Sequence, residues 1–486
     1  MCGVAGILKL GERRIDPDWI EAMCRVQAHR GPDDAGYAFF RHGEGQRREG
    51  GYWVEFTDAE FAHLNEHLPA IQGDYARHEL PRYDFDLALG HRRLSILDLT
   101  HYGHQPMANS DRRLWVVLNG EIYNFPQLRS DLEAKGHVFR TRSDTEVLLH
   151  LWEDQGPDCL AALDGMFGIA VYDRTAGRLY LARDRFGVKP MYWARTDDFL
   201  VFASEPKGIL ASGRIEPRID PGSLAEYMTF QNLYGERILF EGIHLLPPGE
   251  VLEVDVGTVS PTLRRHRYQP GFPSGGAAPT DMDTAAAEVA DAFESAVRRQ
   301  LISDVPVGSY LSGGMDSGSI VAVAGREFPR LLTFTGGFDL TNVSGIEQGF
   351  DERPMAERLS HLLQTEHYDV VLHAGDMPAA MERLAWHMDD PRLGMCHQNW
   401  YVAKLASKFV KVCLAGAGGD ELFGGYPWRY RQGLRAADEA AFDEACFEHW
   451  HRLLPGDELP GIFTGELQPH LARPRETFDA LMAGLP

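Results

Sequence analysis

The sequence motif with the most specific chemistry is Ser312-Gly313-Gly314-Met315-Asp316-Ser317. Residues 305–311 before it predict a buried strand, and residues 318–324 after it predict the start of a helix. Paired glycines let a backbone approach a phosphate, and the amides at a helix N-terminus favour an anion. The serines add hydroxyl donors, and the carboxylate of Asp316 suits the Mg²⁺ that accompanies nucleotide phosphates. The motif therefore predicts a nucleotide-phosphate site of a kind other than the Gly-x-x-x-x-Gly-Lys-Ser/Thr loop, which the sequence lacks.

A second reactive group is Cys2, which follows the first residue, Met1. Once Met1 is removed, a thiol and a free α-amino group belong to the same residue. An α-amino group has a pKa of about 7.7–8.0, so it can accept the thiol proton near neutral pH without a histidine. A small buried residue is the alternative interpretation of Cys2 taken alone. The polar segments that follow favour the nucleophile.

The segments after Cys2 predict an antiparallel architecture for the first half. A charged turn lies at 29–33, and a helix opens at 141–146 with Ser143 or Asp144 as its cap. Strands are predicted at 89–98, 116–124, 166–173 and 178–184. The second of these runs into an Asn-Gly turn, and the last two form a hairpin. Many short strands with few helices indicate packed antiparallel sheets.

The second half alternates strands with helices. Strands are predicted at 305–311, 331–338, 368–372 and 410–414, and helices at 284–301, 353–364 and 398–408. This alternation indicates a parallel doubly wound sheet, which binds its ligand beyond the carboxyl ends of the strands. Between the halves, the sequence predicts a helix around 223–228, a hairpin around 247–250 and an exposed linker at 270–279.

Taken in order, these motifs resemble a known family. Residues 2 to about 210 resemble a class II glutamine amidotransferase domain, through Cys2 and through matching segments at 29–33, 89–98, 103–107, 116–124, 141–146, 166–173, 183–190 and 203–207. The Ser312 motif is similar to the pyrophosphate loop of the ATP-pyrophosphatases, and the whole chain resembles glutamine-dependent asparagine synthetase. The resemblance implies an α/β fold. An N-terminal nucleophile αββα sandwich of antiparallel sheets is followed by a doubly wound parallel-sheet ATP-pyrophosphatase domain.

The resemblance implies roles in the first domain. Cys2 would attack the glutamine carboxamide and release ammonia, leaving a glutamyl thioester that water hydrolyses. Asn119 and the Gly120 amide would form the oxyanion hole. Arg93 would pair with the α-carboxylate of glutamine. The other glutamine-binding residues would be Leu94, Ser95, Ile96, Leu97, Glu121 and Asp144, of which the last two would hold the α-amino group.

The resemblance also implies an ATP site in the second domain. The loop at 415–426 is similar to the second ATP and acceptor loop of asparagine synthetases, and Asp316 and Asp420 would bind Mg²⁺ there. The acceptor carboxylate would attack the α-phosphate of ATP to give an acyl-adenylate and pyrophosphate, and ammonia would then displace AMP. The ATP-binding residues implied are Leu311, Ser312, Gly313, Gly314, Asp316, Ser317, Gly336, Ala415 and Gly416.

Three features depart from the family. Residues 41–86 look like an insertion between two strands, to which we assign no function. Ala417 stands where many relatives carry an acidic side chain, so either Asp389 or Asp390 replaces it or the acceptor chemistry differs. The sequence also ends at Pro486, before the helical segment that supplies a catalytic lysine in relatives. The synthetase domain is therefore expected to be incomplete at its C-terminus.

Three hypotheses follow for the function. The first is glutamine-dependent conversion of aspartate to asparagine through β-aspartyl-AMP, in amino-acid biosynthesis. The second is amidation of a different carboxylate, and the third is a regulatory or glutaminase-only protein. All three share the same predicted domains: a glutaminase domain at 2–220, a connecting hairpin and linker at 221–283, and a synthetase domain at 284–486.

The composition limits the partners. The net charge of −23 argues against nucleic acid or an anionic membrane surface as a main partner. The hydrophobic fraction of 44% and charged fraction of 24% are those of a globular protein. The six cysteines lack C-x-x-C spacing, and the sequence contains neither a signal peptide nor an apolar run of about 18 residues. We therefore expect a cytoplasmic protein that binds small molecules, with a homodimer as the hypothesis for its oligomeric state.

Overall fold

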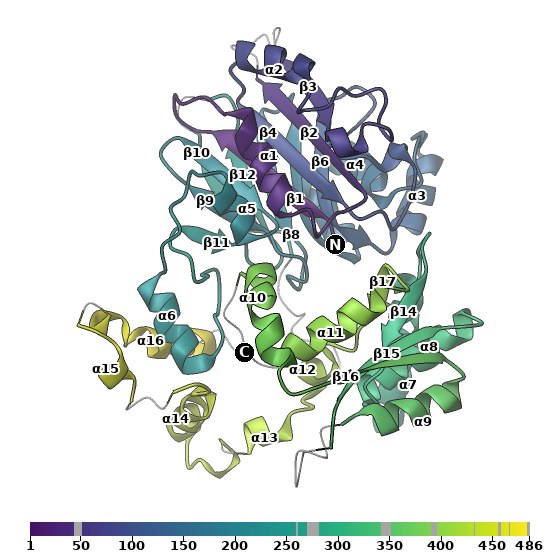
Figure 1. The fold of residues 1–486 in the computed structure, drawn as a ribbon, viewed down its shortest axis with the longest axis vertical. Coiled ribbons are helices and arrows are strands. Elements are labelled where there is room, and N and C mark those ends of the chain that lie inside the picture. The colour runs from purple at the N-terminus through teal and green to yellow at the C-terminus, as the bar shows by residue number, and fades with distance from the viewer. Residues whose placement is uncertain are drawn as a thin grey trace. The chain divides into compact units, whose positions relative to one another are not determined.

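The computed structural model describes residues 1–42, 51–258, 261–269, 281–341, 351–389, 396–431, 433–454, 458–465 and 467–483. The chain folds into two compact units, Met1–Arg218 with Gly235–Ala277 and Ile219–Tyr234 with Ala278–Pro486 (Figure 1). The segment predicted as a connection, 221–283, contributes to both units. The linker predicted at 270–279 lies outside the described residues.

The first unit contains two antiparallel sheets. The seven-stranded sheet has the order β11 (Ile243–Leu245), β9 (Tyr192–Arg195), β10 (Phe199–Ala203), β1 (Gly3–Lys9), β4 (Leu87–Arg93), β2 (Asp34–Arg41) and β3 (Tyr52–Thr57). The six-stranded sheet has the order β13 (Leu263–Arg267), β12 (Glu250–Asp255), β8 (Arg178–Arg183), β7 (Gly165–Asp173), β6 (Leu114–Ile122) and β5 (Met107–Ala108). Every neighbouring pair of strands in both sheets is antiparallel.

Strand β1 is apolar along its length because both faces of its sheet are covered. Val4 and Leu8 point into the core between the two sheets. Ala5 and Ile7, which alternate with them, point into a second core on the outer face. Burial on both faces explains why this strand reads as a continuous apolar run.

Helices cover the outer face of each sheet (Figure 1). The core outside the seven-stranded sheet includes side chains of α1 (Pro17–Val26), α2 (Asp74–Glu79) and α5 (Pro206–Ala211). The core outside the six-stranded sheet includes side chains of α3 (Phe125–Ala134) and α4 (Asp144–Gln155). The four layers are helix, sheet, sheet and helix, so the predicted αββα sandwich is confirmed.

Several local predictions can be compared with this sandwich. The hairpin of β7 and β8 is confirmed by the pairing of Asp173 with Arg178, and Ser143 is the cap of α4, since its hydroxyl accepts the Thr145 amide at 3.1 Å. Segment 41–86 lies between β2 and β4, which pair directly, and it supplies the edge strand β3. Its residues 43–50 lie outside the described residues.

Two turn predictions are wrong. Strand β6 does not turn at Asn119-Gly120 but continues, with these residues opposite Gly168 and Phe167 of β7. The ladder with β7 outweighs the local preference of Asn-Gly for a turn. Residues 247–250 do not form a hairpin either, because β11 joins one sheet and β12 joins the other.

The second unit contains a four-stranded sheet with the order β16 (Glu366–Leu372), β15 (Leu332–Phe338), β14 (Val307–Tyr310) and β17 (Val412–Leu414). All three pairs of neighbouring strands are parallel. Helices α7 (Met282–Gln300), α8 (Met315–Glu327) and α9 (Arg353–Leu363) pack together, and α8 and α9 contribute to one core of the sheet. Helices α10 (Asp376–Met388) and α11 (Cys396–Ala406) pack together, and α11 contributes to a separate core. This arrangement confirms the predicted doubly wound parallel sheet.

A helical region follows the sheet. It contains α12 (Gly419–Phe423), α13 (Pro427–Tyr430), α14 (Glu439–Trp450), α15 (Leu459–Ile462) and α16 (Arg473–Ala483). Helix α6 (Pro221–Phe230) joins this region, because Phe230 contacts the rings of Phe447 and Trp450 and Glu226 accepts a hydrogen bond from Thr477. Helix α6, which precedes the four-stranded sheet by some 80 positions, therefore contributes to the core of this helical region.

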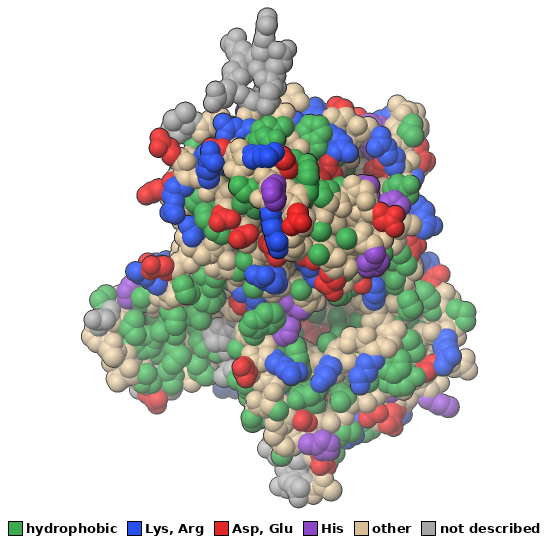
Figure 2. Space-filling model, turned by 45° about the horizontal axis from the view of Figure 1, so that its top comes forward, with side chains coloured by type: hydrophobic (Ala, Val, Ile, Leu, Met, Phe, Trp, Pro, Cys, Tyr) green, Lys and Arg blue, Asp and Glu red, His purple; other side chains and the backbone are tan. Residues whose placement is uncertain are grey.

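The surface carries charges of both signs. On the face drawn in Figure 2, basic and acidic side chains of the described residues are interspersed. Within the described part of the chain, no helix combines the length and the apolar composition needed to cross a bilayer.

Candidate active sites

Cys2 lies at the edge where β1 begins. Strand β1 pairs with β4, and Gly3 lies opposite Arg92, so Cys2 is brought to the residues that follow β4. There the Leu94 amide donates a hydrogen bond to Cys2 Sγ at 3.4 Å, and the Leu94 carbonyl lies 3.8 Å from the same sulfur. These two contacts hold the sulfur of Cys2 against the backbone of Leu94.

Strand β4 is shorter than the predicted strand at 89–98, because it ends at Arg93. The amides that follow are bound by side chains instead of by a neighbouring strand. Leu94 donates to Cys2, and the Ser95 amide donates to the carboxylate of Asp33 at 2.8 Å. These bonds fix the loop of residues 94–97, which the sequence predicted to bind glutamine, against the predicted nucleophile.

Arg93 is buried and engaged with its own loop. Its guanidinium donates to the carbonyls of Thr100 at 3.0 Å, Leu97 at 3.2 Å and Asp98 at 2.5 Å. Gly103 lies so close that a Cβ there would be 1.9 Å from Arg93 Nη2. A guanidinium has five N–H donors, and these three bonds leave two of them without a partner among the described residues. The predicted pairing with a substrate carboxylate would use these two.

Asn119 has an unusual environment. Its side chain is 0% exposed, and neither its amide nitrogen nor its amide oxygen has a hydrogen-bond partner among the described residues. Leaving a buried amide unpaired costs about 1–3 kcal/mol, so an unpaired one is typical of a functional position. Gly120 beside it has no room for a side chain, since a Cβ would lie 2.2 Å from the Met166 carbonyl. The side-chain amide of Asn119 is therefore available to a ligand.

Two carboxyl groups follow on neighbouring elements. Glu121 is the next residue of β6, and Asp144 begins α4, where its carboxylate accepts the Ile122 amide at 2.9 Å. Burial, and then the negative charges of Asp144 and Cys2, raise the pKa of Glu121 well above its usual value. Burial also raises the pKa of Asp144. Glu121 interacts electrostatically with both Asp144 and Cys2, so the two carboxyl groups that the sequence predicted to bind an ammonium lie close to each other, and Glu121 lies close to Cys2.

The structure reveals an ionic network that the sequence did not predict. Arg30 donates to the Cys2 carbonyl at 2.8 Å and to the carboxylate of Glu205 at 3.0 Å. Glu205 also binds His29 at 3.0 Å and Lys207 at 2.7 Å. Burial alone would raise the pKa of Glu205, but the hydrogen bond with His29 and the charges of Arg30 and Lys207 lower it to about 2. The network fixes the segment that carries Cys2.

Lys189 is a second group that sequence reasoning missed. It is 8% exposed, and among the described residues no carboxylate forms an ion pair with its ammonium. Burial and the charge of Arg30 lower its pKa, whereas Glu121 and Cys2 oppose this shift. Burial also lowers the pKa of the N-terminal amine, here that of Met1, to about 6, and Arg30 and Lys189 add to this effect. The signal in the sequence was a lysine between Gly187 and Pro190, inside a segment that matched the family.

The Ser312 motif forms a compact loop between β14 and α8. Ser317 Oγ accepts the Ser312 amide at 3.1 Å and lies 3.0 Å from Ser312 Oγ. Gly313 has a φ of +84°, and a Cβ there would lie 2.5 Å from Met355 Cβ, so only glycine fits. The serine hydroxyls thus hold the loop, while Asp316 stands in the first turn of α8.

The loop after β17 lies directly against Asp316. A Cβ at Gly419 would be 2.3 Å from Asp316 Oδ2, and one at Gly416 would be 2.9 Å from the Ser317 nitrogen. Asp420, the second predicted metal ligand, follows Gly419 in the chain. The structure therefore brings the two predicted loops together at the carboxyl ends of β14 and β17, which are neighbouring parallel strands.

The remaining predicted residues lie at or near the same edge. Leu311 is buried at the end of β14, where its amide donates to the Phe334 carbonyl at 2.9 Å. Gly336 lies on β15 beside it, and a Cβ there would be 2.7 Å from Val402. Ala415 follows β17 and is exposed. Strands β14, β15 and β17, together with the loops and the helix that follow them, thus carry every residue predicted to bind ATP.

The acceptor side is less complete. Ala417 is exposed in the loop after β17 and offers only a methyl group. Asp389 caps the end of α10, whereas Asp390 lies outside the described residues.

Comparisons with known proteins match both units. The glutamine amidotransferase domain family matches residues 73–269, and the asparagine synthase family matches residues 288–475. The chain therefore combines residues that match a glutamine amidotransferase domain with residues that match an asparagine synthase domain. Cys2 lies outside both matched ranges, so its assignment depends on the structure and the motif around it.

Two asparagine synthetases are about one third identical to the chain over the aligned residues. Asparagine synthetase [glutamine-hydrolyzing] 1 of Bacillus subtilis (strain 168) is 34% identical over 433 residues, which cover 88% of this chain and 59% of that protein. Asparagine synthetase [glutamine-hydrolyzing] 3 of the same organism is 34% identical over 357 residues, covering 70% and 56%. The chain therefore spans less than two thirds of the length of these relatives.

A likeness to solved structures is weaker. The glutamine phosphoribosylpyrophosphate amidotransferase of Bacillus subtilis is 19% identical, with a TM-score of 0.39 over 67% of this chain and 64% of that one. A TM-score this low carries no argument, so the fold assignment comes from the sheets themselves.

Proposed function

We propose that the chain hydrolyses glutamine at Cys2 and uses the ammonia, with ATP, to amidate a carboxylate. In the first hypothesis this carboxylate is aspartate, and the products are asparagine, AMP, pyrophosphate and glutamate. The observation that carries the proposal is the pairing of Cys2 Sγ with the Leu94 amide. It is supported by the buried amide of Asn119, which has no partner among the described residues and precedes by two positions the Glu121 carboxyl that interacts with Cys2. The family matches of both units support the same function.

At the first site, the chain's own groups perform the acyl transfer. Cys2 attacks the carboxamide of glutamine, and its α-amino group, once exposed by removal of Met1, accepts the thiol proton. Asn119 Nδ2 and the Gly120 amide donate to the oxyanion, which requires no reorganisation because the Asn119 amide has no competing partner. Glu121 and Asp144 hold the substrate ammonium, and ammonia leaves before water cleaves the thioester.

At the second site, the loops bind the nucleotide. The Ser312 motif and the loop after β17 surround the phosphates with amides and hydroxyls. Asp316 and Asp420 would hold Mg²⁺, since carboxylates on adjoining loops are the oxygen donors that this cation prefers. When bound, Mg²⁺ neutralises charge on the phosphates. The site thereby orients the α-phosphate for attack by the acceptor carboxylate.

A second candidate function is amidation of a carboxylate other than aspartate. Ala417 favours it, because a methyl group at this exposed position of the acceptor loop supplies neither charge nor a hydrogen bond. A site without that acidic group would recognise its acceptor through other contacts. A glutaminase without synthetase activity is the third candidate, and the assay below separates all three.

The test is a pair of assays on the same preparation. Pyrophosphate release from Mg-ATP is measured with ammonia, with and without aspartate, and glutamate release is measured with glutamine. Release of pyrophosphate that depends on aspartate supports the first hypothesis. Release only with another carboxylate supports the second, and glutamate release without any pyrophosphate supports the third.

The nucleophile is tested by replacing Cys2. Cys2→Ala should abolish glutamate release and leave ammonia-dependent pyrophosphate release unchanged, because only the first site uses the thiol. Cys446→Ala, which changes a half-buried cysteine in the second unit, is the matched control and should retain both activities. Glutamine turnover by Cys2→Ala would refute the assignment.

A further inference from the structure

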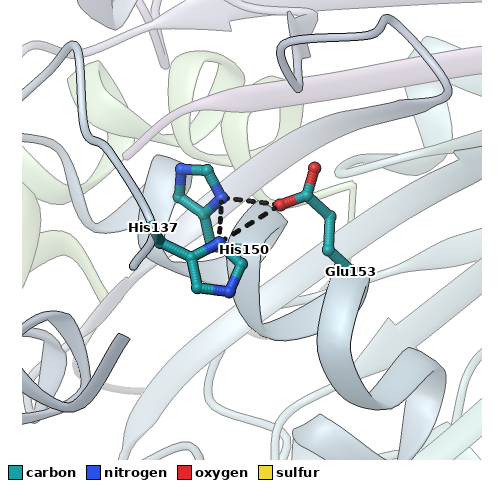
Figure 3. A group of neighbouring side chains, drawn as sticks. All are labelled: His137, His150 and Glu153. Carbon is teal, nitrogen blue, oxygen red and sulfur yellow. Dashed lines mark hydrogen bonds and ion pairs between the residues drawn. The ribbon is translucent and has the colours of Figure 1, made fainter. Parts of the chain in front are cut away.

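A cluster of His137, His150 and Glu153 in the first unit has no role in the proposed reaction. Figure 3 shows the two imidazoles and the carboxylate converging on one point. His137 Nδ1 lies 3.1 Å from His150 Nδ1, and His150 Nδ1 lies 2.6 Å from Glu153 Oε2. The third distance, from His137 Nδ1 to Glu153 Oε2, is 3.6 Å. Three groups that carry lone pairs thus form a small triangle.

Local structure explains the convergence. His150 and Glu153 are three residues apart on α4, so they lie on the same face of the helix. His137 follows the end of α3, where Gly136 has a φ of +99° and the His137 amide donates to the Leu132 carbonyl at 3.1 Å. This helix ending turns the chain back toward α4.

The triangle has the dimensions of a metal site. Nitrogen and oxygen ligands bind Zn²⁺ at about 2.0–2.2 Å in a tetrahedron, which places ligand atoms roughly 3.3 Å from one another. The observed separations of 2.6, 3.1 and 3.6 Å bracket this value. Shifts of less than 1 Å, well within side-chain mobility, would therefore make room for the ion.

Two of the three ligands also have an outer hydrogen-bond partner. His137 Nε2 binds the carboxylate of Asp154 at 2.9 Å, and the second oxygen of Glu153 accepts from Asn109 at 2.6 Å. His150 Nε2 is buried without a hydrogen bond, and its nearest carboxylate is that of Glu146 at 3.9 Å. Histidines that bind metals usually have a carboxylate behind the ring, which fixes the ring and strengthens the ligand.

Hydrogen bonds alone leave this cluster unsatisfied. If His150 carries its proton on Nδ1, that proton can be shared with Glu153 and His137, but Nε2 is then a buried acceptor with no donor. If a cation occupies the triangle, His150 binds it through Nδ1 and carries the proton on Nε2, directed to the side of Glu146. With a cation bound, the Nε2 proton of His150 faces the Glu146 carboxylate at 3.9 Å, an electrostatic contact that an unprotonated Nε2 cannot make.

The charge of the surroundings suits a divalent ion. Among the described residues, the only ion pair that Glu146, Glu153 and Asp154 form with a lysine or arginine is that of Asp154 with Lys135, at 3.3 Å. The side chains of His137 and Glu153 are 18% and 22% exposed, so the site has access to water. Water can supply the fourth ligand.

We propose that His137, His150 and Glu153 bind one Zn²⁺ or a similar first-row divalent cation, which joins the end of α3 to α4. Helix α4 begins at Asp144, a predicted glutamine-binding residue, so the ion stabilises the element that positions one wall of the first site. The ion takes no part in the reaction.

The test is zinc binding by the full chain after removal of metals with a chelator. Equilibrium dialysis and elemental analysis should show one more equivalent of zinc bound by the wild type than by the double variant His137→Ala/Glu153→Gln. His78→Ala is the matched control, because His78 is an exposed histidine of α2 that contacts only the Asp74 carbonyl. Cobalt bound in place of zinc should give the visible absorption of a tetrahedral site in the wild type and in the control.

Two results would overturn the proposal. One is equal zinc binding by the wild type and the double variant, which would place any zinc elsewhere. The other is the absence of any bound zinc in the wild type at micromolar free ion, with the protein folded by circular dichroism. Either result would show that the cluster is held by protons alone.

Discussion

The Glu205 network permits a quantitative prediction. This carboxylate lies 6% exposed among Arg30, His29 and Lys207, and Arg30 in turn holds the carbonyl of Cys2. Its pKa falls from 4.5 to about 2, a shift of about 2.5 units, which corresponds to about 3 kcal/mol of stability at neutral pH. Glu205→Gln removes this contribution and leaves buried cations unpaired. We expect the first unit to lose about 3 kcal/mol at pH 7.

The pH dependence has a definite sign. Because the pKa of Glu205 is lower in the folded chain than in the unfolded chain, its contribution is complete above the unfolded value of 4.5. It is lost as the pH falls toward about 2, where the folded carboxylate takes up its proton. The stability difference between wild type and Glu205→Gln should therefore be constant from pH 7 to pH 5 and shrink below pH 4.5.

The measurement must report the first unit separately from the second. Hydrogen exchange in increasing urea, followed by mass spectrometry of peptides from β1 and β10, does so. Glu216→Gln is the matched control, because Glu216 also pairs with an arginine, Arg218, but its side chain is 76% exposed. The control should change stability by less than about 0.5 kcal/mol. A Glu205→Gln variant that behaves like this control would refute the reasoning.

Three further predictions concern the sites. Asn119→Ala should lower kcat for glutamate release by about 10²–10³ with little change in KM, and an unchanged kcat would exclude Asn119 from the oxyanion hole. Lys189→Met removes a buried positive charge close to Cys2, and a nearby positive charge lowers the pKa of an amine. The acidic limb of the kcat/KM profile should therefore move to higher pH, whereas Lys189→Arg should keep it in place. Gly419→Val forces a side chain against Asp316 and should abolish ATP-dependent pyrophosphate release but not glutamate release. Gly465→Ala, at a glycine with open space around it, should retain both activities, and equal behaviour of the two glycine variants would contradict the close packing of the loops.

The sequence predicted the elements well where a local pattern determines them. The strand and helix around the Ser312 motif follow from an apolar run, a glycine turn and a helix start within about twenty residues. The Asn119-Gly120 turn failed because the decision depends on pairing with β7, more than 40 residues away in the chain. Local preference cannot anticipate a partner that only the fold supplies.

The sites divide in the same way. The loop residues of the predicted ATP site are consecutive in two short segments, so a sequence motif is enough to predict them. Arg30 and Glu205 are separated by 175 positions, and no local pattern around either residue indicates that the two form an ion pair. Both residues lie within segments that matched the family, but only strand order and register explain why their charges meet. The same holds for His137, whose contact with α4 depends on how one helix ends.

The two candidate sites consequently differ in what holds them together. At the first site, Cys2, Arg30 and Glu205 come from the start of the chain, the turn before β2 and the turn after β10, and buried charges connect them. At the second site, the hydroxyl of Ser317 holds the Ser312 motif within six residues. Loosening the sandwich should therefore separate the catalytic groups of the first site, because their contacts exist only in the complete fold. The phosphate loop carries its own geometry and depends on the wider fold chiefly where Gly419 meets Asp316.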